Sequence, residues 1–104
     1  HSLEVMRVNI LEQEESIRYQ LLDRMKQDVE YVIRQVEASK EDAEQKNWSI
    51  MINNIFWGGQ SNHFSTMKDL FGSFSEEKQP DWYSLSQMYA QKRHLEALVG
   101  FELG

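Results

Sequence analysis

The sequence contains no cysteine, and this absence removes several chemistries at once. Disulfide scaffolds, cysteine-ligated zinc or iron–sulfur centres and thiol nucleophiles are all excluded. No apolar run approaches the roughly 20 residues that span a bilayer, and the first four residues lack the basic and apolar regions of a signal peptide. We therefore expect a cytoplasmic protein that makes no contact with a membrane.

Positive charge is also scarce in this chain. It carries 11 Lys and Arg against 17 Asp and Glu, which gives a net charge of −6 and a pI near 5.0. Such a balance disfavours a partner bound through its phosphates, so nucleic acid is not an expected partner. Hydrophobic residues make up 40% of the 104 positions, enough for a packed core. We expect one domain over residues 1–104, in which residues 1–11 are a flexible start or partly a cloning remnant.

The longest patterned segment runs from Glu12 to Ala43 without glycine or proline. Its apolar residues recur at alternating spacings of three and four, which predicts an amphipathic helix. One continuous helix of this length would measure roughly 45 Å, more than a compact domain with a radius of gyration of ~13 Å covers. Either the helix breaks between Ala38 and Lys46, or its free half packs on a second copy. We expect a homodimer, and its predicted seam is the apolar stripe of Leu22, Met25, Val29, Val32 and Val36.

The next apolar cluster allows two interpretations. Trp48, Met51, Ile52, Ile55 and Phe56 share one helical face, with Asn47 placed to cap the helix and the glycine pair 58–59 placed to end it. A short strand is the alternative, because three apolar residues alternate over positions 48–52. The alternation stops after three positions, so we favour the helix.

Two further helices follow from the remaining pattern. Apolar residues at spacings of three and four predict a helix over about Asn62 to Phe74, with Asn62 as its cap. A polar stretch and Pro80 then indicate a surface loop. Ser84 and Gln87 form a capping box before the last apolar stripe, and Gly100 is a natural stop. The fold class is therefore all-α, with a long N-terminal amphipathic helix and two to three shorter helices packed on it.

Catalytic and metal-binding patterns are missing from the sequence. The three histidines, His1, His63 and His94, lie far apart, and no zinc or calcium motif surrounds them. His63 and His94 are best explained as surface residues. The glycine pair 58–59 has neither the preceding strand nor the lysine of a phosphate-binding loop. We expect no enzyme activity, no cofactor and no metal.

The aromatic residues beside the loops are the remaining candidates for function. Phe56 and Trp57 end one predicted helix, and Trp82 and Tyr83 precede another. Core anchoring is the simpler explanation for such residues. The alternative is a partly exposed contact patch of these four residues, because tryptophan and tyrosine often dominate the energetics of interfaces. The basic cluster at residues 92–94 is small, and on an acidic protein it gives weak support for nucleic-acid binding.

Several segments of the chain together resemble a known family. They are residues 19–31 (YQLLDRMKQDVEY), 56–58 (FWG), 67–74 (MKDLFGSF), 78–82 (KQPDW) and 84–88 (SLSQM). In this order they resemble the large polyvalent protein-associated domain 11 family, small domains of phage and conjugative-element proteins in bacteria. The sequence departs from the family pattern by a longer stretch over residues 32–54 and by Phe-Trp-Gly-Gly where the pattern has Leu-Trp-Ala-Gly.

The resemblance implies a protein of a mobile genetic element with a role in establishing the element or countering host defence. It supplies no catalytic residues. We expect a non-enzymatic module that binds a host protein in the cytoplasm of the bacterial host. The alternative is a nucleic-acid-associated accessory protein or an acidic DNA mimic. Mimicry would ordinarily require a more lopsided charge than the seven Lys and Arg against eleven Asp and Glu of residues 1–46.

Overall fold

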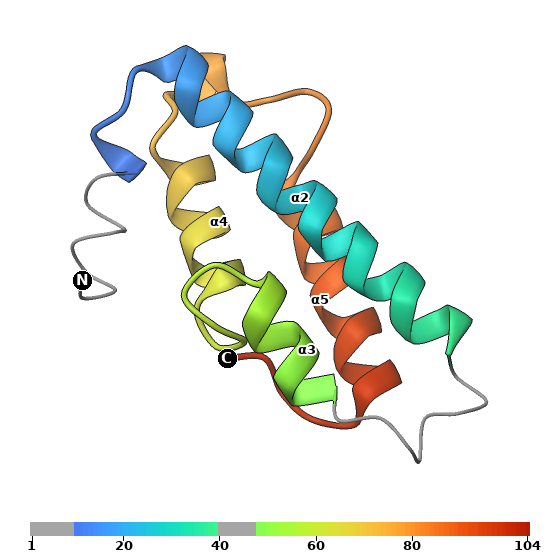
Figure 1. The fold of residues 1–104 in the computed structure, drawn as a ribbon. Helices are drawn as coiled ribbons and strands as arrows, with labels where there is room; N and C mark the ends of the chain where they lie inside the picture. The colour runs from blue at the N-terminus through green and yellow to red at the C-terminus, as the bar shows by residue number, and fades with distance from the viewer. Residues whose placement is uncertain (1–9, 40–47) are drawn as a thin grey trace.

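The computed structural model describes residues 10–39 and 48–104, and the regular structure within these ranges is helical. In chain order the elements are α2 (Glu15–Ala38), α3 (Trp48–Ile55), α4 (His63–Gly72), the 3-10 turn η2 (Glu76–Lys78) and α5 (Leu85–Val99). No strand occurs in the described ranges. The predicted all-α fold, a long N-terminal helix with shorter helices packed on it, is confirmed (Figure 1).

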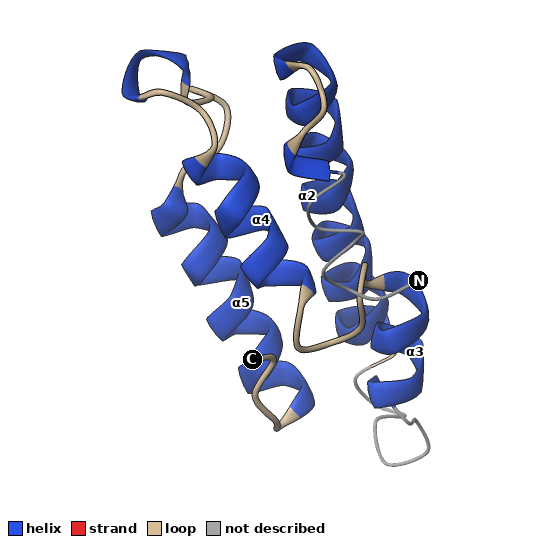
Figure 2. Cartoon of the chain, turned by 90° about the vertical axis from the view of Figure 1, so that its left-hand side faces the viewer, coloured by secondary structure: helices blue, strands red, loops and turns tan. Residues whose placement is uncertain are grey.

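The helices form two layers. Helices α4 and α5 lie side by side and run in opposite directions, and α2 lies across them as the second layer (Figures 1 and 2). Helix α3 packs against α2. The molecule measures 43 × 32 × 18 Å along its principal axes. The core lies between the two layers, where the apolar face of α2 meets the inner faces of the other helices.

The apolar stripe of α2 is covered within a single chain, and the dimer seam predicted from it is wrong. Leu22, Met25, Val29 and Val32 have no exposed surface, and Val36 is 2% exposed. The shorter helices bury all five side chains, because each of them packs against α2. A second copy has no access to this stripe, so a homodimer of this fold would have to use a different surface.

Helix α2 ends inside the interval where a break was predicted. Its last residue is Ala38, and the backbone N–H of Ser39 donates hydrogen bonds to carbonyls of the final turn. Residues 40–47, including the proposed cap Asn47, lie outside the described residues. Of residues 39–47, Ala43 alone is apolar, so the sequence offers no large apolar side chain for a longer stripe.

The segment after residue 47 is a helix and not a strand. Trp48 and Ile52 are the buried residues of α3, and their spacing of four puts them on one helical face. The chain then turns through Gly58 and Gly59, whose φ angles of 75° and 90° favour glycine. The predicted side-chain cap of α4 is wrong, because the Asn62 side chain donates instead to the carbonyl of Gly58 at 2.9 Å.

Helix α5 begins at the predicted capping residue. The Ser84 side chain accepts a hydrogen bond from the Gln87 backbone N–H at 3.1 Å. Replacing Ser84 with alanine is expected to lower the free energy of unfolding by about 1 kcal/mol, because this N–H loses its partner. Urea unfolding curves measure the loss. Ser86→Ala, inside the same first turn and exposed, is the matched control and is expected to stay within about 0.5 kcal/mol of the wild type.

The C-terminal segment folds back onto the bundle. Helix α5 ends at Gly100, whose φ of 83° gives the left-handed stop that the sequence predicts. Leu103 is then buried in the core, and its backbone N–H donates to the Glu96 carboxylate at 2.8 Å. These contacts hold the last residues beside the start of α4 (Figure 1).

Candidate functional site

Two of the four aromatic residues predicted to form a contact patch belong to the core. Phe56 is 3% exposed and Tyr83 is 1% exposed. The ring of Phe56 stacks on the imidazole of His63 with ring centroids 4.2 Å apart. In this conformation neither ring can contact a partner protein. The prediction that Phe56 and Tyr83 are contact residues is therefore wrong, and both are core residues. Both follow the simpler explanation, that aromatic residues at helix ends anchor the helices.

Trp57 is half-buried, and its polar atom is used inside the protein. The indole Nε1–H donates a hydrogen bond of 2.9 Å to the Asp28 carboxylate of α2. The side chain therefore ties the loop between α3 and α4 to the long helix. A partner could reach only the part of the ring that remains exposed.

Trp82 is the most accessible of the four residues, with 40% of its surface exposed. Its ring is nearly parallel to that of Tyr83, with centroids 6.2 Å apart and an interplanar angle of 9°. It lies in the loop before α5 and lines a shallow surface depression together with Tyr19 and Pro80. Trp82 is thus presented at the surface on a loop whose next residue is buried.

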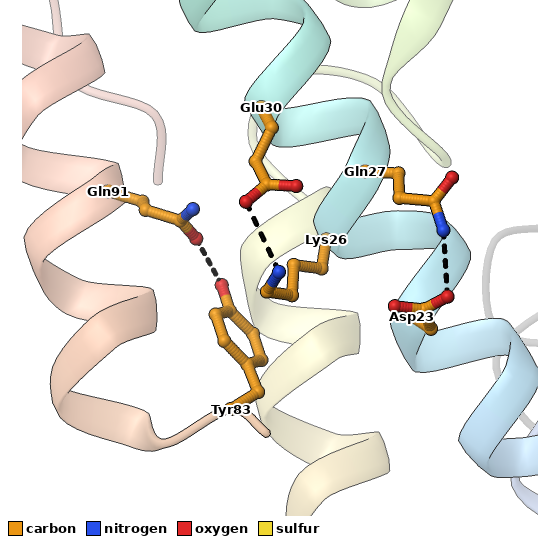
Figure 3. A network of polar contacts seen from close by, with 6 residues as sticks. All are labelled: Asp23, Lys26, Gln27, Glu30, Tyr83 and Gln91. Atoms are coloured by element: carbon orange, nitrogen blue, oxygen red, sulfur yellow. Dashed lines mark hydrogen bonds and ion pairs between the residues drawn. The ribbon is translucent and has the colours of Figure 1, made fainter.

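A polar network fixes Tyr83 beneath this loop (Figure 3). The Tyr83 hydroxyl donates to the side-chain carbonyl oxygen of Gln91 on α5. The Lys26 ammonium lies 5.5 Å from the centre of the Tyr83 ring and forms an ion pair of 3.2 Å with Glu30. Burial, and secondly the Glu30 carboxylate, raise the pKa of the Tyr83 phenol above its ordinary value. The network therefore orients the segment that carries Trp82 and keeps the phenol neutral.

The two tryptophans do not share a surface. Trp57 contacts α2 through Asp28, whereas Tyr83, the neighbour of Trp82, contacts it through Lys26. Residues two positions apart on a helix point roughly 200° apart around its axis. The Trp57 indole and the Tyr83 ring therefore contact opposite flanks of α2, and Trp57 does not line the depression that contains Trp82. Of the predicted contact residues, Trp82 alone keeps the expected exposure.

His63 is the residue that the sequence analysis placed wrongly. It was expected at the surface, but its side chain has no exposed area. Its Nδ1 accepts a hydrogen bond of 2.9 Å from the Trp57 backbone N–H, so the proton lies on Nε2, which donates to the Met25 carbonyl at 3.0 Å. Desolvation by burial lowers the pKa of His63 to about 4. The imidazole is therefore neutral near pH 7 and links the α3–α4 loop to α2.

A sequence signal for this burial did exist. His63, Met67 and Leu70 are spaced by four and three residues, so they share the inward face of α4. Because histidine is polar, the apolar pattern of this segment begins at Phe64 and leaves His63 out. His94 behaves as expected for a surface residue: its Nε2 lies 3.5 Å from the Glu37 carboxylate and half of its side chain is exposed.

A pocket that no sequence pattern predicts lies between α4 and α5. It has a volume of about 170 Å³ and is lined by three residues of each helix and by Gly104. Those residues are Phe64, Ser65, Lys68, Met88, Tyr89 and Lys92. They lie far apart in the sequence. Of the candidate binding features of the sequence, only the basic cluster at residues 92–94 includes one of them, Lys92.

Metal sites and membrane-spanning helices are both absent from the part of the chain that the structure describes. Within residues 10–39 and 48–104, no three His, Cys, Asp or Glu side chains come together in a way that could hold a metal ion. In the same ranges, no helix has the length and apolar character that crossing a membrane requires. In the described residues, the candidate sites are therefore Trp82 and the pocket between α4 and α5.

Comparison with known proteins gave one result. The family model described as large polyvalent protein-associated domain 11 matches residues 15–95. The match begins at the first residue of α2 and ends within α5, so it covers the helices that build the core. Searches of curated proteins and of solved structures found no match.

Proposed function

Because the chain belongs to the large polyvalent protein-associated domain 11 family, we propose that it is a non-enzymatic protein-binding module of a mobile genetic element. In this proposal the module acts in the cytoplasm of the bacterial host. Its partner is a host protein, and the binding counters host defence. The proposal combines the family with one structural observation, the exposure of an anchored tryptophan.

That observation is Trp82, which carries the proposal. Two-fifths of a large side chain remain exposed although the neighbouring residue, Tyr83, is fully packed. Such a residue gains binding energy when a partner covers it, and it loses little freedom on binding because its segment is already fixed. Tryptophan is among the residues that most often dominate the energetics of protein interfaces.

Two further features support surface contact as the function. The pocket between α4 and α5 holds about 170 Å³, and the larger depression beside Trp82, of about 580 Å³, is open and shallow, whereas common small-molecule sites are clefts of roughly 300–1,000 Å³ that enclose most of the ligand. The buried histidine, which could have been a catalytic base, uses both of its ring nitrogens in hydrogen bonds within the fold. Both features favour a module that binds another protein through its surface.

Affinity capture from bacterial lysate tests the proposal. The wild-type chain and Trp82→Ala are immobilised, the lysate is treated with nuclease, and retained proteins are identified by mass spectrometry. We expect a host protein that is retained by the wild type and reduced at least about tenfold by Trp82→Ala, because truncating an interface anchor costs ≥2 kcal/mol. Tyr31→Ala is the matched control, since Tyr31 is 45% exposed on α2, and it should retain the protein.

The outcomes separate the possible functions. Retention that is equal in the wild type and in Trp82→Ala contradicts binding through Trp82. Retention that disappears with nuclease moves nucleic acid ahead of a protein partner. The identity of the retained protein tests the last part of the proposal, because a protein with no part in host defence contradicts the counter-defence role.

A further inference from the structure

The pocket between α4 and α5 has an apolar floor. Phe64 and Met88 line it and are 5% and 4% exposed. They come from α4 and α5, which run in opposite directions (Figure 2), and the pocket lies between these two helices. We call the surface formed by Phe64, Lys68, Met88, Tyr89 and Lys92 the α4–α5 groove. The pocket, with its volume of about 170 Å³, is large enough for a single apolar side chain of a partner.

The rim of the groove is positively charged in a protein that is otherwise acidic. Lys68 extends from α4 and Lys92 from α5. Among the described residues, neither ammonium forms an ion pair with a side-chain carboxylate, and Lys92 donates to the main-chain oxygen of Gly104, the last residue of the sequence, at 2.8 Å. Lys26 and Lys78, by contrast, each have a carboxylate partner. In a chain with a net charge of −6, Lys68 and Lys92 are two cations that pair with no side-chain carboxylate of the described residues.

An exposed aromatic ring borders the same groove. Tyr89 lines the pocket and is 48% exposed. Leu85 lies one helical turn before it on the same face of α5 and is 37% exposed. The groove therefore offers an apolar floor, an aromatic edge and two cations within the surface of one helix pair.

From this combination we infer that the α4–α5 groove binds an acidic, amphipathic peptide segment of the protein partner. An apolar side chain of the segment enters the pocket between Phe64 and Met88 and packs against Tyr89. Carboxylates flanking that side chain pair with Lys68 and Lys92. This inference rests on the proposed protein-binding function and adds the chemistry of the segment that is recognised.

Charge and apolarity together favour a peptide over nucleic acid. Phosphates would also pair with the two lysines, but a net charge of −6 repels a polyanion at longer range. The apolar floor of Phe64 and Met88 offers no favourable contact to a charged phosphate backbone, whereas an apolar side chain can pack against it. Opposite charges at the rim of an interface mainly set which partner is accepted and how fast it binds.

The test uses the full chain and a random-peptide phage library. Peptides enriched on the immobilised wild type are synthesised, and their affinities are measured by fluorescence anisotropy. We expect enriched peptides that combine a net negative charge with an aliphatic or aromatic residue. Lys68→Glu/Lys92→Glu should weaken their binding at least about tenfold, and Tyr89→Ala should weaken it as well. Lys68→Glu alone is the second variant in case the double variant does not fold, which circular dichroism would show.

The matched control reverses two charges elsewhere. Arg24 and Arg34 are exposed on α2, so Arg24→Glu/Arg34→Glu changes the net charge equally without touching the groove. It should alter affinity by less than about twofold if the lysines act locally. Enriched peptides without acidic bias, an absence of enriched peptides, equal losses in both double variants, or unchanged binding by Lys68→Glu/Lys92→Glu would each overturn the inference.

Two further experiments distinguish peptide binding in the groove from nucleic-acid binding and from protein binding through Trp82 alone. A labelled DNA duplex that binds the wild type and not Lys68→Glu/Lys92→Glu would overturn the peptide assignment and give the groove to nucleic acid. Capture of a host protein that needs Trp82 and is unaffected by Lys68→Glu/Lys92→Glu would leave the proposed function standing and reject the groove. Loss of that capture in both variants supports the two together.

Discussion

Replacing His63 with alanine is expected to lower the free energy of unfolding by about 3–5 kcal/mol, the largest effect of any substitution considered for this protein. The substitution leaves a cavity beside Phe56, on which the imidazole stacks at 4.2 Å. It also removes the acceptor of the Trp57 backbone N–H and the donor to the Met25 carbonyl. Removing a buried ring and leaving a polar group without its partner both destabilise a fold.

Urea unfolding of His63→Ala, followed by circular dichroism, measures this loss. His94→Ala is the matched control because His94 is half-exposed and its imidazole Nε2 lies 3.5 Å from the equally exposed Glu37 carboxylate. We expect the control to stay within about 0.5 kcal/mol of the wild type. Equal stability of His63→Ala and His94→Ala would contradict the structural role given to His63.

The stability of the fold is expected to fall as the pH drops from about 6.5 to about 4. In the unfolded chain His63 titrates at its ordinary pKa of 6.5, whereas burial lowers its pKa to about 4 in the folded state. Between these values the unfolded state binds more protons, so protonation favours unfolding. The stabilisation is complete above pH 6.5 and is lost as the pH falls. The full difference amounts to about 3 kcal/mol.

Unfolding curves at a series of pH values between 7 and 4 check this expectation. Carboxyl groups titrate at the acid end of the range, so the contribution of His63 is isolated by comparison with His63→Gln, which cannot gain the proton. The slope between pH 6.5 and 5 should flatten in His63→Gln and persist in His94→Gln. A slope that survives in His63→Gln would assign the pH dependence to other groups.

The helices were predictable because their signals are local. The stripe of α2 repeats every three or four residues over five buried positions, and each of these is buried in the structure. Ser84 and Gly100 bound α5 through contacts with residues at most four positions away. Patterns of this kind depend on backbone geometry alone, so the sequence contains all the information that they need.

Local sequence patterns did not predict which elements bury the apolar stripe of α2. The sequence indicated that Val29 and Val36 must be buried, but it did not indicate whether another helix of the same chain or a second copy buries them. The answer depends on how the short helices pack against α2, which is a property of contacts distant in sequence. The shorter helices proved sufficient, and the expected dimer seam is the core of one chain.

The candidate site was predicted in part. Trp57 and Trp82 were equal candidates because each lies in a loop next to a helix. In the structure, Trp57 donates a hydrogen bond to Asp28, 29 positions away in the sequence, whereas Trp82 remains exposed. Such long-range hydrogen bonds have no local pattern. The α4–α5 groove escaped prediction for the same reason, since Lys68 and Lys92 meet only through the packing of two helices.

The two flanks of α2 hold different segments of the chain. Trp57 and His63 tie the α3–α4 loop to one flank, while Tyr83, Gln91 and Lys26 form a polar network on the other. The first set stabilises the fold, and the second holds the loop that presents Trp82. Substitutions in the first set should therefore affect stability, whereas Trp82→Ala should affect binding and leave the fold intact.

Nuclease-treated capture from bacterial lysate by the wild type and by Trp82→Ala, quantified by mass spectrometry, tests the protein-binding function most directly. The proposed function predicts a host protein that the wild type and Tyr31→Ala retain and that Trp82→Ala loses. Equal retention by all three chains, or the absence of any retained protein, would contradict it.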